Sequence, residues 1–332
     1  MNFRLSQQLV LIALLACTFQ ACGAPLQLTQ GAGRSAGTRG LAKSPAPGGA
    51  IAPKFVGNIT TRGEVRPDFA NYWNQLTPEN EGKWASVEAT RDQMDWTILD
   101  AEVQYARDRG FPFKEHALVW GRQAPEWLAG LSRKDQAAEV EEWIRLFCER
   151  YPDTPLIDVV NEPDHATPAF ADALGGAGAS GHDWVLWAFR TARKHCPNSR
   201  LILNDYDVLR FDTDKFIDIA NTVKRARLLD AIGAQAHDLE TQELSDLKAN
   251  LDKLSKLGVP IYISEYDIDE EDDAKQKEIM EQQFPIFWET SRVAGITFWG
   301  YVYGATWKKN AGLIRDGTPR PALVWLMDYL HR

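Results

Sequence analysis

Short apolar runs alternate with longer amphipathic stretches from Pro53 to the end of the chain. The predicted strands are residues 54–60, 75–77, 112–119, 156–160, 200–204, 231–235, 260–264 and 295–299. Strands that alternate with helical stretches pair in parallel, since a parallel connection requires a crossover. Eight such units without a change in composition predict an α/β fold, namely a single (β/α)8 TIM barrel over residues 53–332.

The amphipathic stretches predict the crossover helices. These helices are residues 98–109, 134–150, 183–195, 213–226, 244–256, 273–291 and 321–330. Only the short segment 65–73 is available for a helix in the first unit. An open dinucleotide-binding sheet is disfavoured because no glycine-rich fingerprint follows the first strand. The sequence therefore predicts no cofactor.

The first residues have the pattern of an export signal. Arg4 provides the positive charge, and Leu9–Ala16 is an apolar run that is too short to span a bilayer. We therefore expect a signal peptide over residues 1–22, with Cys17 and Cys22 as alternative lipid attachment sites if the cut is of the lipoprotein type. The expected location is outside the cytoplasm, as a secreted, periplasmic or outer-membrane-tethered protein.

Residues 23–52 are rich in Gly, Ala, Pro and Ser and lack apolar periodicity, which predicts a flexible linker. Beyond it, Cys148 and Cys196 each end a helical stretch just before a proline and a strand. In an oxidising compartment they could form a disulfide, and two buried thiols are the alternative. The expected oligomeric state is a monomer.

The formal net charge of the 332-residue chain is -9. This balance argues against a nucleic-acid partner, because there is no basic excess to neutralise phosphates. An uncharged ligand fits better, and the 12 tryptophans supply aromatic faces of the kind that hold sugar rings. The six histidines are too scattered for a zinc site, so no metal is predicted.

Two apolar runs about a hundred residues apart each end in a glutamate. Residues 156–160 lead into Asn161 and Glu162, and residues 260–264 lead into Glu265. A carboxylate inside a parallel sheet is costly to bury. At the last residue of a strand, however, it points into the mouth of the sheet, where such folds build their sites. Two facing carboxylates can hydrolyse a glycosidic bond, one as proton donor and the other as nucleophile.

Polar or aromatic side chains follow nearly every other predicted strand. Each alone has an ordinary structural explanation, such as a lone histidine satisfied in the core. Their joint occurrence at the C-terminal mouth of a barrel indicates a binding site. These residues are Glu79, Asn80, Lys83, His116, Trp120, Gln123, Asn161, Tyr206, Gln235, His237, Asp267, Trp299 and Trp307.

The strand-end motifs resemble those of glycoside hydrolase family 10, the endo-β-1,4-xylanases. The resemblance runs from about Asn58 to the C-terminus, through residues 77–84, 116–120, 158–162, 204–206, 235–237 and 264–267. It implies a retaining endo-β-1,4-xylanase whose partner is a polysaccharide, xylan or a related β-glycan. In that mechanism Glu162 matches the acid/base and Glu265 the nucleophile.

The resemblance also implies roles for the surrounding residues. Asn161 would bind the sugar 2-hydroxyl, while His237 and Asp267 would orient the nucleophile. Sugar-binding residues on the non-reducing side would be Glu79, Asn80, Lys83, His116, Trp120, Gln123 and Trp299, and those near the sugar of Asn161 would be Tyr206, Gln235 and Trp307. We expect His237 and Gln235 to keep Glu265 ionised, and carboxylates or rings to raise the pKa of Glu162.

The chain departs from the family pattern in three places. Gly121 stands where members carry a second histidine, segment 299–308 lacks the usual Asp and Ser-Trp-Arg, and the first barrel unit is short. These departures leave substrate preference and subsite affinities open, but not the pair of glutamates. Two alternatives to a xylanase remain. One is a retaining β-glycosidase of the same barrel that cuts another β-linked glycan or short xylo-oligosaccharides. The other is a non-catalytic carbohydrate-binding barrel, which the presence of both glutamates disfavours.

Overall fold

The computed structural model describes residues 54–331. The predicted signal peptide (1–22) and linker (23–52) lie outside the described residues. Within 54–331, no helix is both long and apolar enough to cross a membrane.

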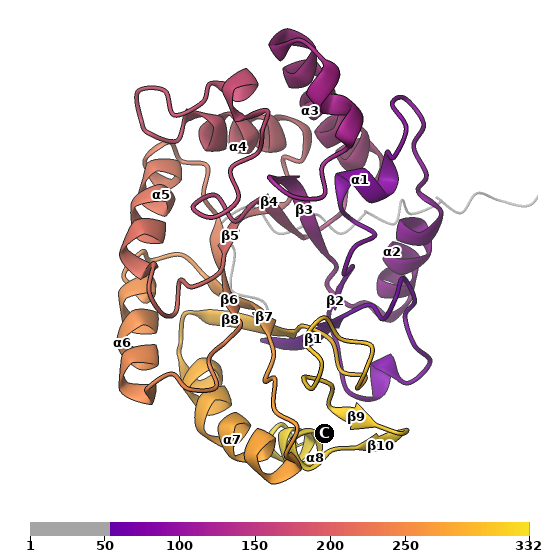
Figure 1. The fold of residues 1–332 in the computed structure, drawn as a ribbon, viewed down its shortest axis with the longest axis vertical. Helices are drawn as coiled ribbons and strands as arrows, with labels where there is room; N and C mark the ends of the chain where they lie inside the picture. Colours follow the sequence, from indigo (N-terminus) through magenta and orange to yellow (C-terminus); the bar gives the residue numbers. More distant parts are fainter. Residues whose placement is uncertain (1–53, 332) are drawn as a thin grey trace, which may run out of the picture. The chain divides into compact units, whose positions relative to one another are not determined.

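Eight parallel strands form one sheet that closes on itself (Figure 1). The strands are β1 (Phe55–Ile59), β2 (Leu76–Thr77), β3 (Lys114–Trp120), β4 (Leu156–Asn161), β5 (Arg200–Asp205), β6 (Ala231–Ala236), β7 (Ile261–Tyr266) and β8 (Val293–Phe298). Their order is β2-β1-β8-β7-β6-β5-β4-β3. The two ends meet where the backbone N–H of Leu76 donates to the carbonyl oxygen of Pro112 over 3.1 Å. The predicted (β/α)8 barrel is therefore confirmed, and every predicted strand is present.

Helices surround the strands on the outside of the barrel (Figure 1). The helices are α1 (Trp84–Val87), α2 (Thr97–Arg109), α3 (Arg133–Arg150), α4 (Asp183–His195), α5 (Thr213–Arg225), α6 (Leu244–Ser255), α7 (Asp273–Glu289) and α8 (Pro321–Tyr329). A small hairpin, β9 (Ile314–Arg315) with β10 (Thr318–Pro319), precedes α8.

The first barrel unit has no α-helix among its described residues. The predicted segment 65–73 forms only a 3-10 turn, Phe69–Asn71. Directly after it, the N–H of Asn74 donates to the carbonyl oxygen of Val56 in β1 over 3.0 Å. Because the chain must return to the sheet at this point, it has no room for further helical turns.

Six buried apolar residues fill the N-terminal end of the barrel. They lie near the beginnings of their strands and pack apart from the main core: Phe55, Leu156, Ile202, Ala231, Tyr262 and Ala294. The rings of Phe55 and Tyr262 stack with centroids 5.7 Å apart. A Cβ atom on Gly295 would lie 2.4 Å from the Phe55 ring, so only glycine fits there. This apolar layer seals one end of the barrel and leaves the other for polar side chains.

Cys148, in the last turn of α3, forms a disulfide with Cys196 at the C-terminus of α4. Their Cα atoms are 5.3 Å apart, and 48 residues separate them in the sequence. Of the two alternatives left open by the sequence, the structure has the disulfide. A link across this many residues stabilises the fold by restricting the unfolded chain.

Candidate active site

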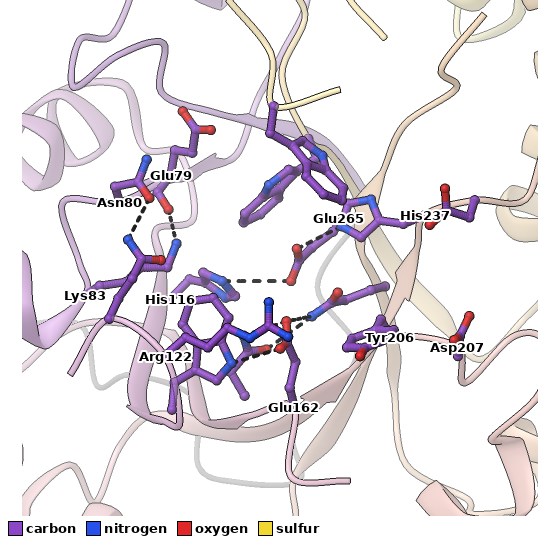
Figure 2. Close-up of a pocket in the computed structure, with 17 residues that line it drawn as sticks. Glu79, Asn80, Lys83, His116, Arg122, Glu162, Tyr206, Asp207, His237 and Glu265 are labelled. Carbon is purple, nitrogen blue, oxygen red and sulfur yellow. Dashed lines mark hydrogen bonds and ion pairs between the residues drawn. The ribbon is translucent and has the colours of Figure 1, made fainter. Parts of the chain in front are cut away.

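The predicted site residues gather at the C-terminal ends of the strands. All of them except Asp267 line one pocket, and Asp267 lies directly behind His237. Figure 2 shows Glu79, Asn80 and Lys83 on one side of Glu162 and Glu265, and Tyr206 on the opposite side. The pocket therefore extends to both sides of a central pair of carboxylates.

Glu162 follows the last residue of β4 and is only 8% exposed. Its Oε2 accepts a hydrogen bond from the Trp120 indole over 2.9 Å, and its Oε1 accepts from Gln235 over 3.4 Å. Burial, followed by the negative charge of Glu265, raises the pKa of Glu162 above its usual value and outweighs these hydrogen bonds. Glu162 is thus placed to hold a proton at higher pH than an exposed glutamate does.

Glu265, near the end of β7, has the opposite electrostatics. Its Oε1 accepts from the Asn204 amide over 2.8 Å, and its Oε2 lies 3.1 Å from Nε2 of His237. Burial by itself would raise the pKa of Glu265, but the interaction with His116, the hydrogen bond and charge of His237 and the charge of Lys114 together outweigh burial and lower the pKa to about 2. Glu265 is therefore ionised at neutral pH.

His237 is the cation that is hydrogen-bonded to Glu265. Its Nδ1 donates to Oδ2 of Asp267 over 2.9 Å while its Nε2 donates to Glu265. Against the cost of burial, Asp267 and Glu265 raise the pKa of His237 to about 10. The Trp307 indole also donates to Asp267 Oδ2, over 2.8 Å. His116, by contrast, has a pKa lowered chiefly by burial, so this ring is neutral at pH 7.

Two asparagines connect the carboxylates. The Nδ2 group of Asn204 donates to Glu265 and, over 2.8 Å, to Oδ1 of Asn161. Asn161 in turn donates to Glu162 over 3.4 Å. Gln235 donates to Asn161 and Glu162 and not to Glu265, so the expectation that it hydrogen-bonds Glu265 is wrong. Although Gln235 is paired with Glu265 in the register of β6 and β7, its side-chain amide points to Glu162.

Behind the pocket, a buried group of side chains lies on the side of Glu265. Lys114 Nζ donates to Oδ2 of Asp158 over 2.8 Å, and Nδ1 of His116 lies 2.9 Å from the same oxygen. Because Nδ1 carries the proton donated to this carboxylate, Nε2 of His116 is left facing Glu265, 3.9 Å from its Oε1. Lys83 donates to the backbone carbonyl of Glu79 and lies 5.4 Å from the centre of the Trp120 ring.

Three lining residues were not predicted: Arg122, Asp207 and Asp238. Asp207 and Asp238 share a positive φ, at 56° and 57°, with Glu162 at 54°. A left-handed conformation is uncommon for residues other than glycine, although Asp tolerates it better than Glu, and it turns a side chain out of the strand direction. The only sequence signal for these lining residues is their position shortly after predicted strands, because a sequence pattern contains no φ angles.

Two groups of side chains bring potential cation ligands close together: Asp164, His165 and Asp212, and Glu88, Asp92 and Glu139. In the first, both histidine nitrogens already donate to carboxylates. In the second, Arg91 pairs with Glu139. The donor atoms are satisfied within the protein, so we assign no metal to either group.

The sequence matches the family model described as "Glycosyl hydrolase family 10" over residues 47–329. The chain belongs to glycosyl hydrolase family 10. It is 48% identical to endo-1,4-beta-xylanase B of Cellvibrio japonicus over 286 residues, which are 85% of this chain and 47% of the relative. The chain thus spans about half the length of that relative.

Solved structures agree with this family. Native xylanase 10B from Thermotoga maritima has a TM-score of 0.73 at 25% identity, over 84% of this chain and 95% of that chain. Xylanase 10B from Thermotoga petrophila RKU-1, solved in complex with xylobiose, has the same TM-score at 26% identity, over 84% and 94%. The family expected from the strand-end motifs is confirmed.

Gly121 departs from the family pattern for a steric reason. A Cβ atom at this position would lie 2.0 Å from the carbonyl oxygen of Ala166 and 2.6 Å from its carbonyl carbon. Ala166 belongs to the turn after Glu162, and its N–H donates to the carbonyl oxygen of Glu162 over 2.7 Å. Glycine at 121 therefore allows the turn after Glu162 to approach the end of β3, and a histidine there has no space.

We expect Gly121→Ala to lower the free energy of unfolding by about 1–3 kcal/mol, because backbone atoms cannot yield as a flexible side chain does. Chemical denaturation measures this loss. Gly130→Ala is the matched control, since nothing lies within 4 Å of a Cβ atom built there. Equal unfolding midpoints for the two variants would contradict the steric explanation.

Proposed function

We propose that this protein is a retaining endo-β-1,4-xylanase that hydrolyses internal bonds of xylan by double displacement. The observation that carries the proposal is the pair of buried carboxyl groups, Glu162 with a raised pKa and Glu265 with a pKa of about 2, in one pocket. Two carboxyl groups with opposite proton affinities fit the acid and the nucleophile of a retaining glycosidase. The 48% identity to a xylanase supports xylan as substrate.

In the first step, Glu265 attacks the anomeric carbon while Glu162 donates its proton to the leaving oxygen. The His237–Asp267 pair keeps Glu265 ionised and fixes its orientation. Asn161, held by Asn204 and Gln235, is positioned to bind the sugar hydroxyl next to the reacting carbon. The products of this step are a glycosyl-enzyme ester and a shortened glycan.

In the second step, the loss of negative charge on Glu265 removes the nearest charge that raised the pKa of Glu162. Glu162 is then ionised and takes a proton from water, which attacks the ester. The same residue thus acts as acid and then as base. Each of the two substitutions inverts the configuration of the anomeric carbon, so the product retains the original configuration.

The substrate is tested by measuring reducing ends released from xylan, mixed-linkage glucan and cellulose. We expect release from xylan with internal cuts, seen as a rapid fall in chain length. Hydrolysis of another β-glycan or only of short xylo-oligosaccharides would favour the alternative glycosidase. Binding without hydrolysis on all substrates would favour a carbohydrate-binding barrel.

We expect Glu162→Ala to retain the first step on aryl glycosides with very good leaving groups, because such groups need little protonation. Glu265→Ala should lose that step, with activity reduced by about 10⁴-fold or more, because the nucleophile is absent. Pre-steady-state release of the phenol measures the step directly. Equal losses in the two variants would refute the assigned roles.

The pH dependence of kcat/KM follows from the two pKa shifts. The first step requires Glu162 protonated, so activity should fall as pH rises through its raised pKa, and Glu162→Gln should lack this alkaline limb. It also requires Glu265 ionised, so activity should fall only as pH drops toward about 2. His237→Asn should move this acid limb to higher pH, because a cation beside Glu265 is removed. An acid limb that stays in place would contradict the role of His237.

We also propose that the protein is exported through its signal peptide, that it is a monomer, and that Cys17 or Cys22 carries a lipid if the signal is of the lipoprotein type. The Cys148–Cys196 disulfide supports an oxidising compartment. Mass spectrometry of the mature N-terminus tests the first proposal, and retention of Met1 at the N-terminus would refute it. Light scattering in solution tests the monomer.

A further inference from the structure

The turn after Glu162 contains a histidine that the mechanism above does not use. His165 does not line the pocket, and 17% of its side chain is exposed. Its Nδ1 donates to Oδ1 of Asp205 over 2.8 Å, and its Nε2 donates to Oδ2 of Asp212 over 3.2 Å. With both nitrogens engaged by carboxylates, the ring is fixed in position and in rotation.

The surroundings of His165 favour its charged form. The carboxylates near it are Asp164, Asp205 and Asp212, and the only lysine of this group is Lys215, 2.6 Å from Asp212 and 3.6 Å from Asp164. The hydrogen bond to Asp205, against the effect of burial, raises the pKa of His165 to about 9. Burial raises the pKa of Asp205 as well, and the bond from His165 counters that rise. The ring is therefore an imidazolium at neutral pH.

The imidazolium of His165 covers one face of Tyr206. The two ring centroids are 3.8 Å apart with 25° between the planes. The backbone N–H of Tyr206 donates over 2.9 Å to the same oxygen of Asp205 that accepts from His165. A cation against the face of an aromatic ring is attractive, and more so where water is excluded. Tyr206 is thus held on one side while its remaining surface lines the pocket.

His165 is also tied to the acid/base. Its backbone N–H donates to the carbonyl oxygen of Glu162 over 3.2 Å. The second oxygen of Asp205 accepts from the N–H of Asp164 over 3.1 Å, which fixes the same turn. Asp205 therefore connects the turn after Glu162 to Tyr206, and His165 contacts both Asp205 and the Tyr206 ring.

We propose that His165 is a positioning residue that holds Tyr206 as a rigid platform for the sugar on the leaving-group side of the bond that is cut. Tyr206 lies across the carboxylate pair from Glu79 and Lys83 (Figure 2), and the charge of Glu162, after burial, raises its pKa. This position assigns Tyr206 to the departing sugar and not, as the family resemblance implies, to the sugar of Asn161. The inference rests on the proposed glycosidase function and adds a residue that fixes the binding of the departing sugar.

The test compares two substrates in the full-length protein. Xylotetraose must place sugars on the leaving-group side, whereas β-xylobiosyl fluoride places none there and needs little help from an acid. For His165→Phe, which keeps a ring but loses the charge and both hydrogen bonds, we expect kcat/KM to fall about tenfold on xylotetraose and to change by less than about twofold on the fluoride.

A second readout is the fate of the glycosyl-enzyme formed from the fluoride when xylobiose is added. Xylobiose binds on the leaving-group side as acceptor, so the ratio of transfer to hydrolysis should fall in His165→Phe. Asp212→Asn, which keeps a hydrogen-bonding oxygen for His165 but removes a charge, should show the same change to a smaller extent. If His165→Phe does not fold, Asp212→Asn provides the same test.

His195→Phe is the matched control. His195 has a similar exposure of 15% and also bonds a carboxylate, Glu141 over 3.2 Å, but it lies at the end of α4 and does not line the pocket. The His195→Phe variant should leave kcat/KM unchanged on both substrates. Equal losses on the two substrates, or no loss, in the His165 and Asp212 variants would overturn the inference alone. A wild-type protein that cleaves neither substrate would instead overturn the proposed function.

Discussion

The ion pair between His237 and Glu265 is the interaction on which the rest of the site depends. A buried carboxylate is unfavourable unless a cation and hydrogen-bond donors compensate it. Here the cation is itself buried, so it requires a second carboxylate, Asp267, to keep its proton. The three side chains together carry one net negative charge. After burial, the charge of Glu265 is the next cause of the raised pKa of Glu162, so the ionised state of one carboxyl favours the protonated state of the other.

The barrel supplies the precision that this charge balance needs. Its strand register places functional residues of neighbouring strands side by side: Trp120 with Asn161, Asn161 with Asn204, and Gln235 with Glu265. The chain of hydrogen bonds from Trp120 to Glu265 therefore follows the sheet itself. Between them, Gly233 leaves room for Asn204, whose Oδ1 would lie 2.1 Å from a Cβ atom at that position. Rigid strands hold the carboxylates more exactly than loops could.

The eight strands and most of the pocket could be predicted from sequence because both depend on local patterns. Apolar runs mark strands, and the first polar residues after each run lie at the same end of a parallel barrel. The missed features depend on contacts between distant segments. The amide of Gln235 in β6 bonds Asn161 in β4, which does not lie on an adjacent strand. The steric need for Gly121 arises from a carbonyl group 45 positions away. The positive φ of Asp207 and Asp238 is a backbone angle that the sequence pattern does not record. The 3-10 turn of the first unit is likewise imposed by the pairing of the next segment with β1.

One departure from the family pattern, Gly121, lies against the turn after Glu162. Gly121 admits the backbone of Ala166, and the neighbouring residue in that turn, His165, bonds Asp205 and stacks on Tyr206. The absence of a side chain directly after β3 therefore makes room for the turn that holds His165. A side chain at position 121 would displace the backbone of Ala166, so exchanges at Gly121 and at His165 act on the same turn. The effects of the two exchanges on stability are therefore not expected to be additive.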